Sequence, residues 1–98
     1  MRITYLVCYD ITDDRRLRQV HKFMLGFGDR VQYSVFFCDL SDSEKILMLE
    51  GLNPLINHRE DKIMIVRLGP ADGRVSENIE TLGISGSLQT AERKALIF

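Results

Sequence analysis

An apolar run near the N-terminus constrains the fold more than any other feature of this chain. Apolar side chains occupy almost every position of residues 3–9, and the run ends on the carboxylate of Asp10. Runs of this kind are typical of strands covered on both faces, which lie in the middle of a sheet. The run therefore predicts a central strand with an acid where it ends.

Asp10 has two interpretations. An ionised carboxylate at the end of a buried strand is costly unless hydrogen bonds, a cation or water receive it, which favours a functional site. Aspartate is also common in the turn before a helix, where it caps the first backbone N–H groups. The run itself is compatible with both a site and a cap.

The length of 98 residues predicts one domain with a thin core, because folding at this size buries only roughly 60–65% of the unfolded surface. The two cysteines, Cys8 and Cys38, lie in apolar strand-like runs outside any CxxC or zinc pattern, so we expect reduced core residues of a cytoplasmic protein. No run approaches the roughly 20 apolar residues of a membrane helix, and no signal-peptide pattern is present. We therefore expect no contact with a membrane and no export.

The charges are unevenly distributed. A net charge of −1 argues against a general nucleic-acid coating protein, which would carry a basic excess. A basic cluster nevertheless follows Asp10; it contains Arg15, Arg16, Arg18, His21, Lys22 and Arg30. Screening limits each charge to about 8 Å at physiological salt, so a local cluster can bind phosphates in a neutral protein. An ordinary solvated helix face explains the cluster equally well.

Helical and strand patterns alternate after the first strand. Thr12 can cap a helix that ends at Gly26 and that carries Asp13 and Asp14 in its first turn. Negative charge there meets the positive end of the helix dipole, which explains both acids without a metal.

Three further elements complete the predicted domain. Residues 30–39 alternate as a strand that is bent or broken at Tyr33–Ser34. A capping box from Ser41 begins a second helix, with a kink or restart at Asn53–Pro54. Residues 62–68 form another strand. This order predicts an α+β sandwich of the ferredoxin-like class, with two helices on one face of a mainly antiparallel sheet.

The C-terminal part has more than one interpretation. Residues 75–82 keep a helical spacing, yet residues 79–82 fit a short strand equally well. We expect the domain to cover residues 1–83, and residues 84–98 to form a flexible connection and an interface strand. The apolar end, Ala95–Phe98, should not remain in water, so we expect it to join a sheet edge, with a second protomer as the host.

Two separated motifs carry a family resemblance. They are Tyr5–Asp14 (YLVCYDITDD), which leads into an Arg-rich helix start, and Asp29–Phe36 (DRVQYSVF). In this order they resemble the CRISPR-associated protein two family. Members of that family are small dimeric subunits of the spacer-acquisition machinery and are often described as metal-dependent endonucleases. The resemblance extends over nearly the whole chain.

The resemblance implies a site as well as a fold. It implies a homodimer in which Asp10 meets its symmetry mate, a strand at residues 79–82, and a C-terminal strand that pairs with the partner protomer. Asp10 is then the expected catalytic and metal-binding residue, and Mg²⁺ or Mn²⁺ is the expected ion. The residues expected to contact nucleic acid are Tyr9, Arg16, Arg18, Arg30, Ser34 and Phe37.

The function implied by the resemblance is CRISPR adaptation in antiviral defence. The expected homodimer binds nucleic acid, either double-stranded DNA or single-stranded RNA, and bridges CRISPR integrase subunits during spacer acquisition. Metal-dependent endonuclease or endoribonuclease activity, the hydrolysis of phosphodiesters, is expected in addition, with arginines stabilising the added negative charge. Two alternatives stay open: a toxin-type endoribonuclease outside CRISPR, and a purely structural adaptor without catalysis.

Overall fold

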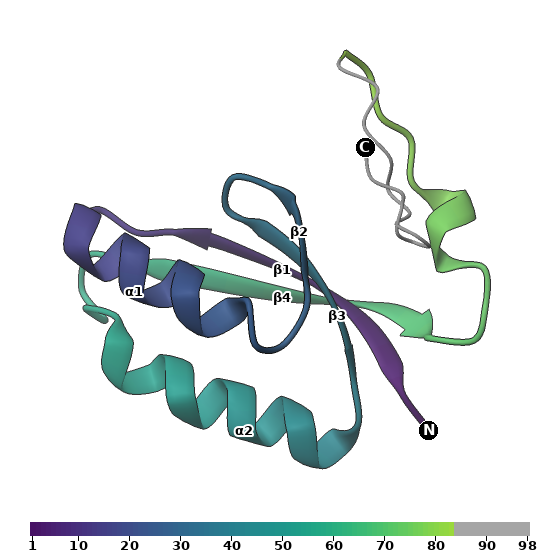
Figure 1. The fold of residues 1–98 in the computed structure, drawn as a ribbon, viewed down its shortest axis with the longest axis horizontal. Coiled ribbons are helices and arrows are strands. Elements are labelled where there is room, and N and C mark those ends of the chain that lie inside the picture. Colours follow the sequence, from purple (N-terminus) through teal and green to yellow (C-terminus); the bar gives the residue numbers. More distant parts are fainter. Residues whose placement is uncertain (84–98) are drawn as a thin grey trace.

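The computed structural model describes residues 1–83, and its elements follow the predicted order (Figure 1). They are β1 (Ile3–Asp10), α1 (Asp14–Met24), β2 (Asp29–Gln32), β3 (Val35–Leu40), α2 (Asp42–Leu52), the 3₁₀ helix η1 (Asn53–Leu55), β4 (Lys62–Pro70) and the 3₁₀ helix η2 (Val75–Asn78). The expected connection and interface strand over residues 84–98 lie outside the described residues.

One antiparallel sheet carries the fold. Its strand order is β2-β3-β1-β4, so β1 pairs with β3 on one side and with β4 on the other. Both helices lie on the same side of this sheet (Figure 1). These features confirm the predicted α+β ferredoxin-like fold and the central place of β1. No helix among residues 1–83 is long and apolar enough to cross a bilayer.

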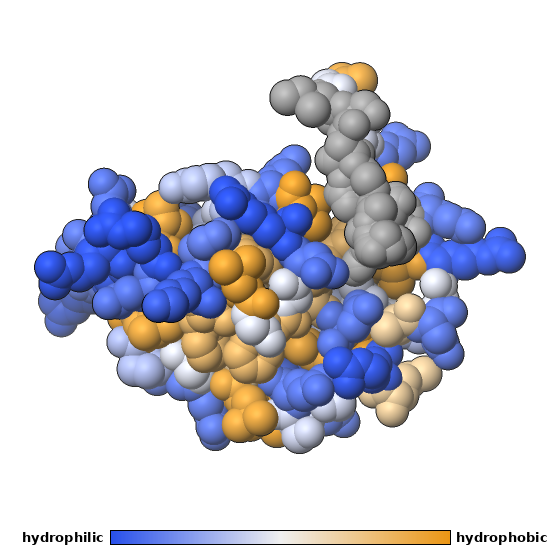
Figure 2. Space-filling view, in the orientation of Figure 1, coloured by the Kyte–Doolittle hydropathy of each residue, from blue (hydrophilic) through white to orange (hydrophobic). Residues whose placement is uncertain are grey.

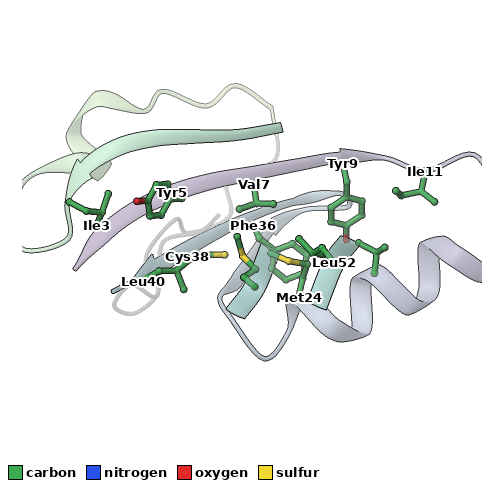
Figure 3. Close-up of a cluster of buried hydrophobic side chains, with 12 residues drawn as sticks. Ile3, Tyr5, Val7, Tyr9, Ile11, Met24, Phe36, Cys38, Leu40 and Leu52 are labelled. Atoms are coloured by element: carbon green, nitrogen blue, oxygen red, sulfur yellow. The ribbon is translucent and has the colours of Figure 1, made fainter. Parts of the chain in front are cut away.

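Successive side chains of β1 point alternately to the helix side and to the opposite side of the sheet. Ile3, Tyr5, Val7 and Tyr9 point towards the helices and are buried, as strand geometry requires of every second residue. Figure 3 shows them clustered with side chains from β3 and both helices; the buried members from those elements are Val20, Met24, Phe36, Cys38, Leu40, Met48 and Leu52. The main cluster of buried side chains therefore lies between the sheet and the two helices.

The opposite face of the sheet, here called the open face, carries Leu6, Cys8, Met64 and Val66. In the register of β1 and β4, Leu6 lies opposite Val66 and Cys8 lies opposite Met64. Met64 is 50% exposed and Val66 41% exposed, while Leu6 and Cys8 are half-buried. Among residues 1–83 the two helices cover only one face of β1, so they do not supply the cover that was predicted for its second face. Cys8 and Cys38 do not form a disulfide with each other.

Local sequence signals fix three boundaries. The capping box forms as predicted: the Ser41 hydroxyl accepts the Glu44 N–H at 3.2 Å, and the Glu44 carboxylate accepts the Ser41 N–H at 2.9 Å. The helix restart at Pro54 appears as η1, because proline cannot donate to the helix interior but fits its first turn. The strand over residues 30–39 is broken at Tyr33–Ser34 into β2 and β3, as predicted.

Two sequence predictions are wrong. The N-cap of α1 is Asp13 and not Thr12; the Asp13 carboxylate accepts the Arg16 N–H at 3.0 Å. Residues 79–82 form no strand. A strand is stable only beside another strand that receives its N–H and C=O groups, and in the described part of the chain β4 pairs with β1 alone.

Candidate functional site

Asp10 is an exposed carboxylate at the last position of β1. It follows Leu6 and Cys8 along the strand at every second position, so its side chain belongs to the open face. Because Asp13 caps α1, the interpretation of Asp10 as a helix cap is wrong. Within residues 1–83, no cationic side chain forms an ion pair with Asp10. The carboxylate is therefore available to a ligand at the rim of an apolar surface.

The loop that follows Asp10 is held by a buried acid, Asp61, whose side chain is 0% exposed. Its carboxylate accepts the backbone N–H groups of Thr12 at 3.0 Å and Asn57 at 2.8 Å. It also accepts Arg16 Nε at 2.8 Å, and Arg16 Nη2 reaches Glu60 at 3.1 Å. The Arg16 guanidinium and the two N–H groups hold the pKa of Asp61 well below its usual range. This network ties the segment after β1 and the start of α1 to the loop before β4.

Arg16 therefore differs from the other arginines expected at nucleic acid. Its side chain is only 24% exposed and is neutralised by Asp61. Its hydrogen bond with Asp61 also raises the pKa of Arg16. A phosphate contact through Arg16 stays a prediction, whereas the structure gives this residue a positioning role for the loop after Asp10.

A pocket of about 300 Å³, here called the α1 pocket, opens between α1 and the turn that joins β2 to β3. Its described lining residues are Tyr9, Leu17, Arg18, His21, Arg30 and Tyr33. Hydrophilic side chains gather at the end of the molecule where α1 begins (Figure 2). The structure thus brings three of the predicted nucleic-acid residues, Tyr9, Arg18 and Arg30, into one concave surface.

The floor of the α1 pocket is formed by packed aromatic side chains. The Tyr9 ring stacks on Phe36 with centroids 6.1 Å apart, and its hydroxyl lies 3.4 Å from Nδ1 of His21. Burial raises the pKa of Tyr9 in spite of the nearby positive charge of Arg30, so the phenol stays protonated. At the mouth, the Arg30 guanidinium carbon lies 5.1 Å from the centroid of the Tyr33 ring. This is a cation–π contact, which leaves the positive charge available to a ligand.

Two guanidinium groups of the α1 pocket carry uncompensated charge. Arg18 and Arg30 are both exposed, and neither forms an ion pair with a carboxylate of residues 1–83. Such groups attract phosphates, because guanidinium and phosphate match in both charge and hydrogen-bond geometry.

The remaining predicted residues lie elsewhere. Ser34 is in the turn between β2 and β3, where its carbonyl accepts the Tyr9 N–H at 3.0 Å. Phe37 is buried and pairs with Leu6, which places it on the side of the sheet that faces away from the helices. Asp10 and Tyr9 are neighbours in sequence but point to opposite faces of the sheet. The structure therefore does not bring Asp10 into the α1 pocket.

Sequence reasoning missed Leu17, Tyr33 and Asp61 as parts of these sites and grouped His21 only with the basic cluster. Leu17 and His21 lie four residues apart on one helix face, which the sequence does show. No local pattern marks Asp61 as part of this network, because Arg16 and Thr12, the partners that join it to the loop after Asp10, are 45 and 49 residues away.

In the part of the chain that the structure describes, no three His, Cys, Asp or Glu side chains converge as a metal site. An exposed carboxylate such as Asp10 is a suitable hard oxygen ligand for Mg²⁺ or Mn²⁺. An ion at Asp10 would therefore need further donors from a second protomer, from water or from a substrate.

Comparison with known proteins gives consistent results. The family model described as CRISPR associated protein Cas2 matches residues 1–74. A CRISPR-associated endoribonuclease Cas2 of Rhodospirillum rubrum is 43% identical over 93 residues, which cover 95% of this chain and 88% of the relative. One of Geobacter sulfurreducens is 41% identical over 85% of this chain and 86% of the relative. The crystal structure of Streptococcus pyogenes Cas2 is similar with a TM-score of 0.75 and 32% identity, over 83% of this chain and 100% of that chain.

Proposed function

The chain belongs to the CRISPR-associated protein Cas2 family, and from this premise we propose that it works as a homodimer in CRISPR adaptation. The homodimer binds nucleic acid, bridges integrase subunits and cleaves phosphodiester bonds with the help of a divalent ion. One observation carries the proposal: Asp10 is an exposed carboxylate at the end of the central strand, free of the capping role that would otherwise explain it.

The open face supports the dimer. Exposed apolar side chains that form a continuous surface are characteristic of interaction sites, and Met64 and Val66 are both half-exposed beside Leu6 and Cys8. A second copy with the same surface would cover it through a symmetric contact. Since Asp10 lies at the rim of the open face, this packing is able to bring one carboxylate from each protomer to a shared site.

The divalent ion, Mg²⁺ or Mn²⁺, would be held by the two Asp10 carboxylates together with water or substrate oxygens. When bound, such an ion supplies Lewis-acid polarisation of a phosphodiester and a more acidic water. The protein itself would bind the substrate's phosphates through Arg18 and Arg30. Arg16 and Asp61 would fix the loop after Asp10, because their ion pair joins that loop to the remainder of the fold.

A cleavage assay tests the catalytic part of this proposal. Asp10→Asn should abolish divalent-dependent cleavage of single-stranded RNA or duplex DNA, because it removes the anionic ligand while preserving size. Asp14→Asn is the matched control, since Asp14 is an exposed acid in the first turn of α1. Equal cleavage by wild type and Asp10→Asn would exclude Asp10 from the chemistry.

A structural adaptor without catalysis is the second candidate. It is favoured by the finding that, within residues 1–83, one protomer offers no converging set of three metal ligands. Spacer uptake in cells separates the two candidates. An adaptor retains uptake with Asp10→Asn and co-purifies with the integrase, whereas a catalyst loses uptake although the variant remains folded and dimeric.

A further inference from the structure

We propose that the α1 pocket binds one unstacked nucleotide of a single-stranded nucleic acid. The base would lie against the ring of Tyr33 over the apolar floor, and Arg18 and Arg30 would bind the adjoining phosphate. This inference rests on the proposed function and deepens it, because it names the form of nucleic acid that the helix side of the fold accepts.

The positive charge of the α1 pocket suits an anionic ligand. None of its described lining residues is acidic, and two of them are arginines. Arg16, only two residues before Arg18, is neutralised by Asp61. The two neighbouring arginines therefore differ in whether a carboxylate of the described residues compensates their charge. A guanidinium group without a carboxylate partner is well suited to a phosphate oxygen.

The apolar part of the α1 pocket suits a flat ring. Tyr33 is 67% exposed, so its ring is accessible to a ligand. The Arg30 guanidinium lies over the Tyr33 ring. The turn between β2 and β3 therefore presents an aromatic ring together with a positive charge. Tyr9 and Leu17 supply the surface beneath it. Every nucleobase has a π-face that can stack on such a ring, whatever its sequence.

The α1 pocket is formed before any ligand enters. The Tyr9 ring is fixed by Phe36 and by the contact of its hydroxyl with Nδ1 of His21. The His21 ring is itself tilted against Phe36, with centroids 5.7 Å apart. Since Nδ1 faces Tyr9, Nε2 is the His21 nitrogen left to hydrogen-bond a base or a sugar. A pre-formed site avoids the cost of ordering these side chains on binding.

The size of the α1 pocket favours a single strand. A volume of about 300 Å³ lies at the lower end of the range for small-molecule sites and suits one nucleotide. Bases of a single strand leave the stack readily, whereas a base of a duplex must first be unpaired and unstacked. The α1 pocket should therefore discriminate between single-stranded and duplex nucleic acid.

The test measures affinity for a fluorescent oligouridylate and for a duplex DNA of the same length, both in EDTA so that nothing is cleaved. Tyr33→Ala should weaken binding of the oligouridylate by about 5- to 150-fold, the range for loss of one base–aromatic stack. Binding of the duplex should not change. Tyr33→Phe keeps the ring and should retain wild-type affinity for both probes. A 4-thiouridine oligonucleotide should also crosslink to the α1 pocket.

The outcomes are distinct. If Tyr33→Ala binds the oligouridylate as tightly as wild type does, or if it weakens both probes equally, the inference about the α1 pocket is overturned. If wild type binds neither probe, nucleic-acid binding itself fails, and the proposed function fails with it. Tyr33 is mostly exposed, so Tyr33→Ala should melt at the wild-type temperature; Tyr33→Leu provides a second variant without an aromatic ring.

Discussion

Replacing Met64 and Val66 together with glutamate should convert the proposed dimer into a monomer. Full burial of one Val or Met side chain is worth about 1.5–3 kcal/mol. Met64 is 50% exposed and Val66 41% exposed in the single chain, so covering the exposed part of each contributes about 1 kcal/mol. A symmetric dimer contains each residue twice, which gives about 4 kcal/mol, or nearly a thousandfold in the dissociation constant.

Sedimentation velocity over a range of protein concentrations measures this effect directly. The matched control places glutamate at Ile46 and Leu47, which are 55% and 59% exposed on α2, on the helix side of the sheet. The control should sediment as wild type does. A dimeric M64E/V66E protein at concentrations where wild type is dimeric would refute the assignment of the open face as the interface, and a monomeric wild type would refute the dimer itself.

Three further predictions concern the loop after Asp10, the α1 pocket and the packing of β3. The depressed pKa of Asp61 means that its carboxylate stabilises the fold above a pH of about 4 and that this contribution is lost as the pH falls further. Wild type should therefore lose more thermal stability on acidification than Asp61→Asn does in scanning calorimetry; parallel pH curves would contradict this. Arg18→Ala should make the binding of single-stranded RNA less dependent on salt: in anisotropy titrations the magnitude of the slope of log affinity against log salt should fall by about 0.7. Arg59→Ala, outside the α1 pocket, should leave this slope unchanged. Gly28→Ala would overlap the backbone carbonyl of β3 and should lower the free energy of unfolding in urea by about 1–3 kcal/mol. The control is Gly26→Ala, whose Cβ meets its nearest neighbour at 3.4 Å.

Local rules were sufficient for most of the fold. The capping box at Ser41, the restart at Pro54 and the break at Tyr33–Ser34 each depend on residues within four positions of one another, and all three are confirmed. The cap of α1 was mispredicted because Thr12 bonds with Asp61, 49 residues away. A local preference for threonine as a cap cannot compete with a buried carboxylate that accepts both its N–H and its hydroxyl.

For the candidate site, too, the sequence predicts what depends on neighbouring residues and misses what depends on distant ones. The sequence places Arg16 and Arg18 in the same basic cluster, and nothing nearby distinguishes them. The fold brings Asp61 and Glu60 to Arg16, whereas Arg18 forms no ion pair with a carboxylate of residues 1–83. The sequence therefore shows where the basic side chains are. Whether each of them is available to a phosphate depends on acidic partners from another part of the chain.

The step from Tyr9 to Asp10 separates the two proposed activities. Because successive side chains of a strand point to opposite faces, Tyr9 belongs to the α1 pocket and Asp10 belongs to the open face. A nucleotide held by Tyr33 therefore does not present its own phosphate to Asp10; a strand bound there must pass around the end of β1 to reach the carboxylate. The segment that it passes is the one fixed by Asp61 through Thr12 and Arg16. The proposed binding on the helix side and the proposed chemistry at Asp10 would thus be joined by the loop that the ion pair of Arg16 and Asp61 holds in place.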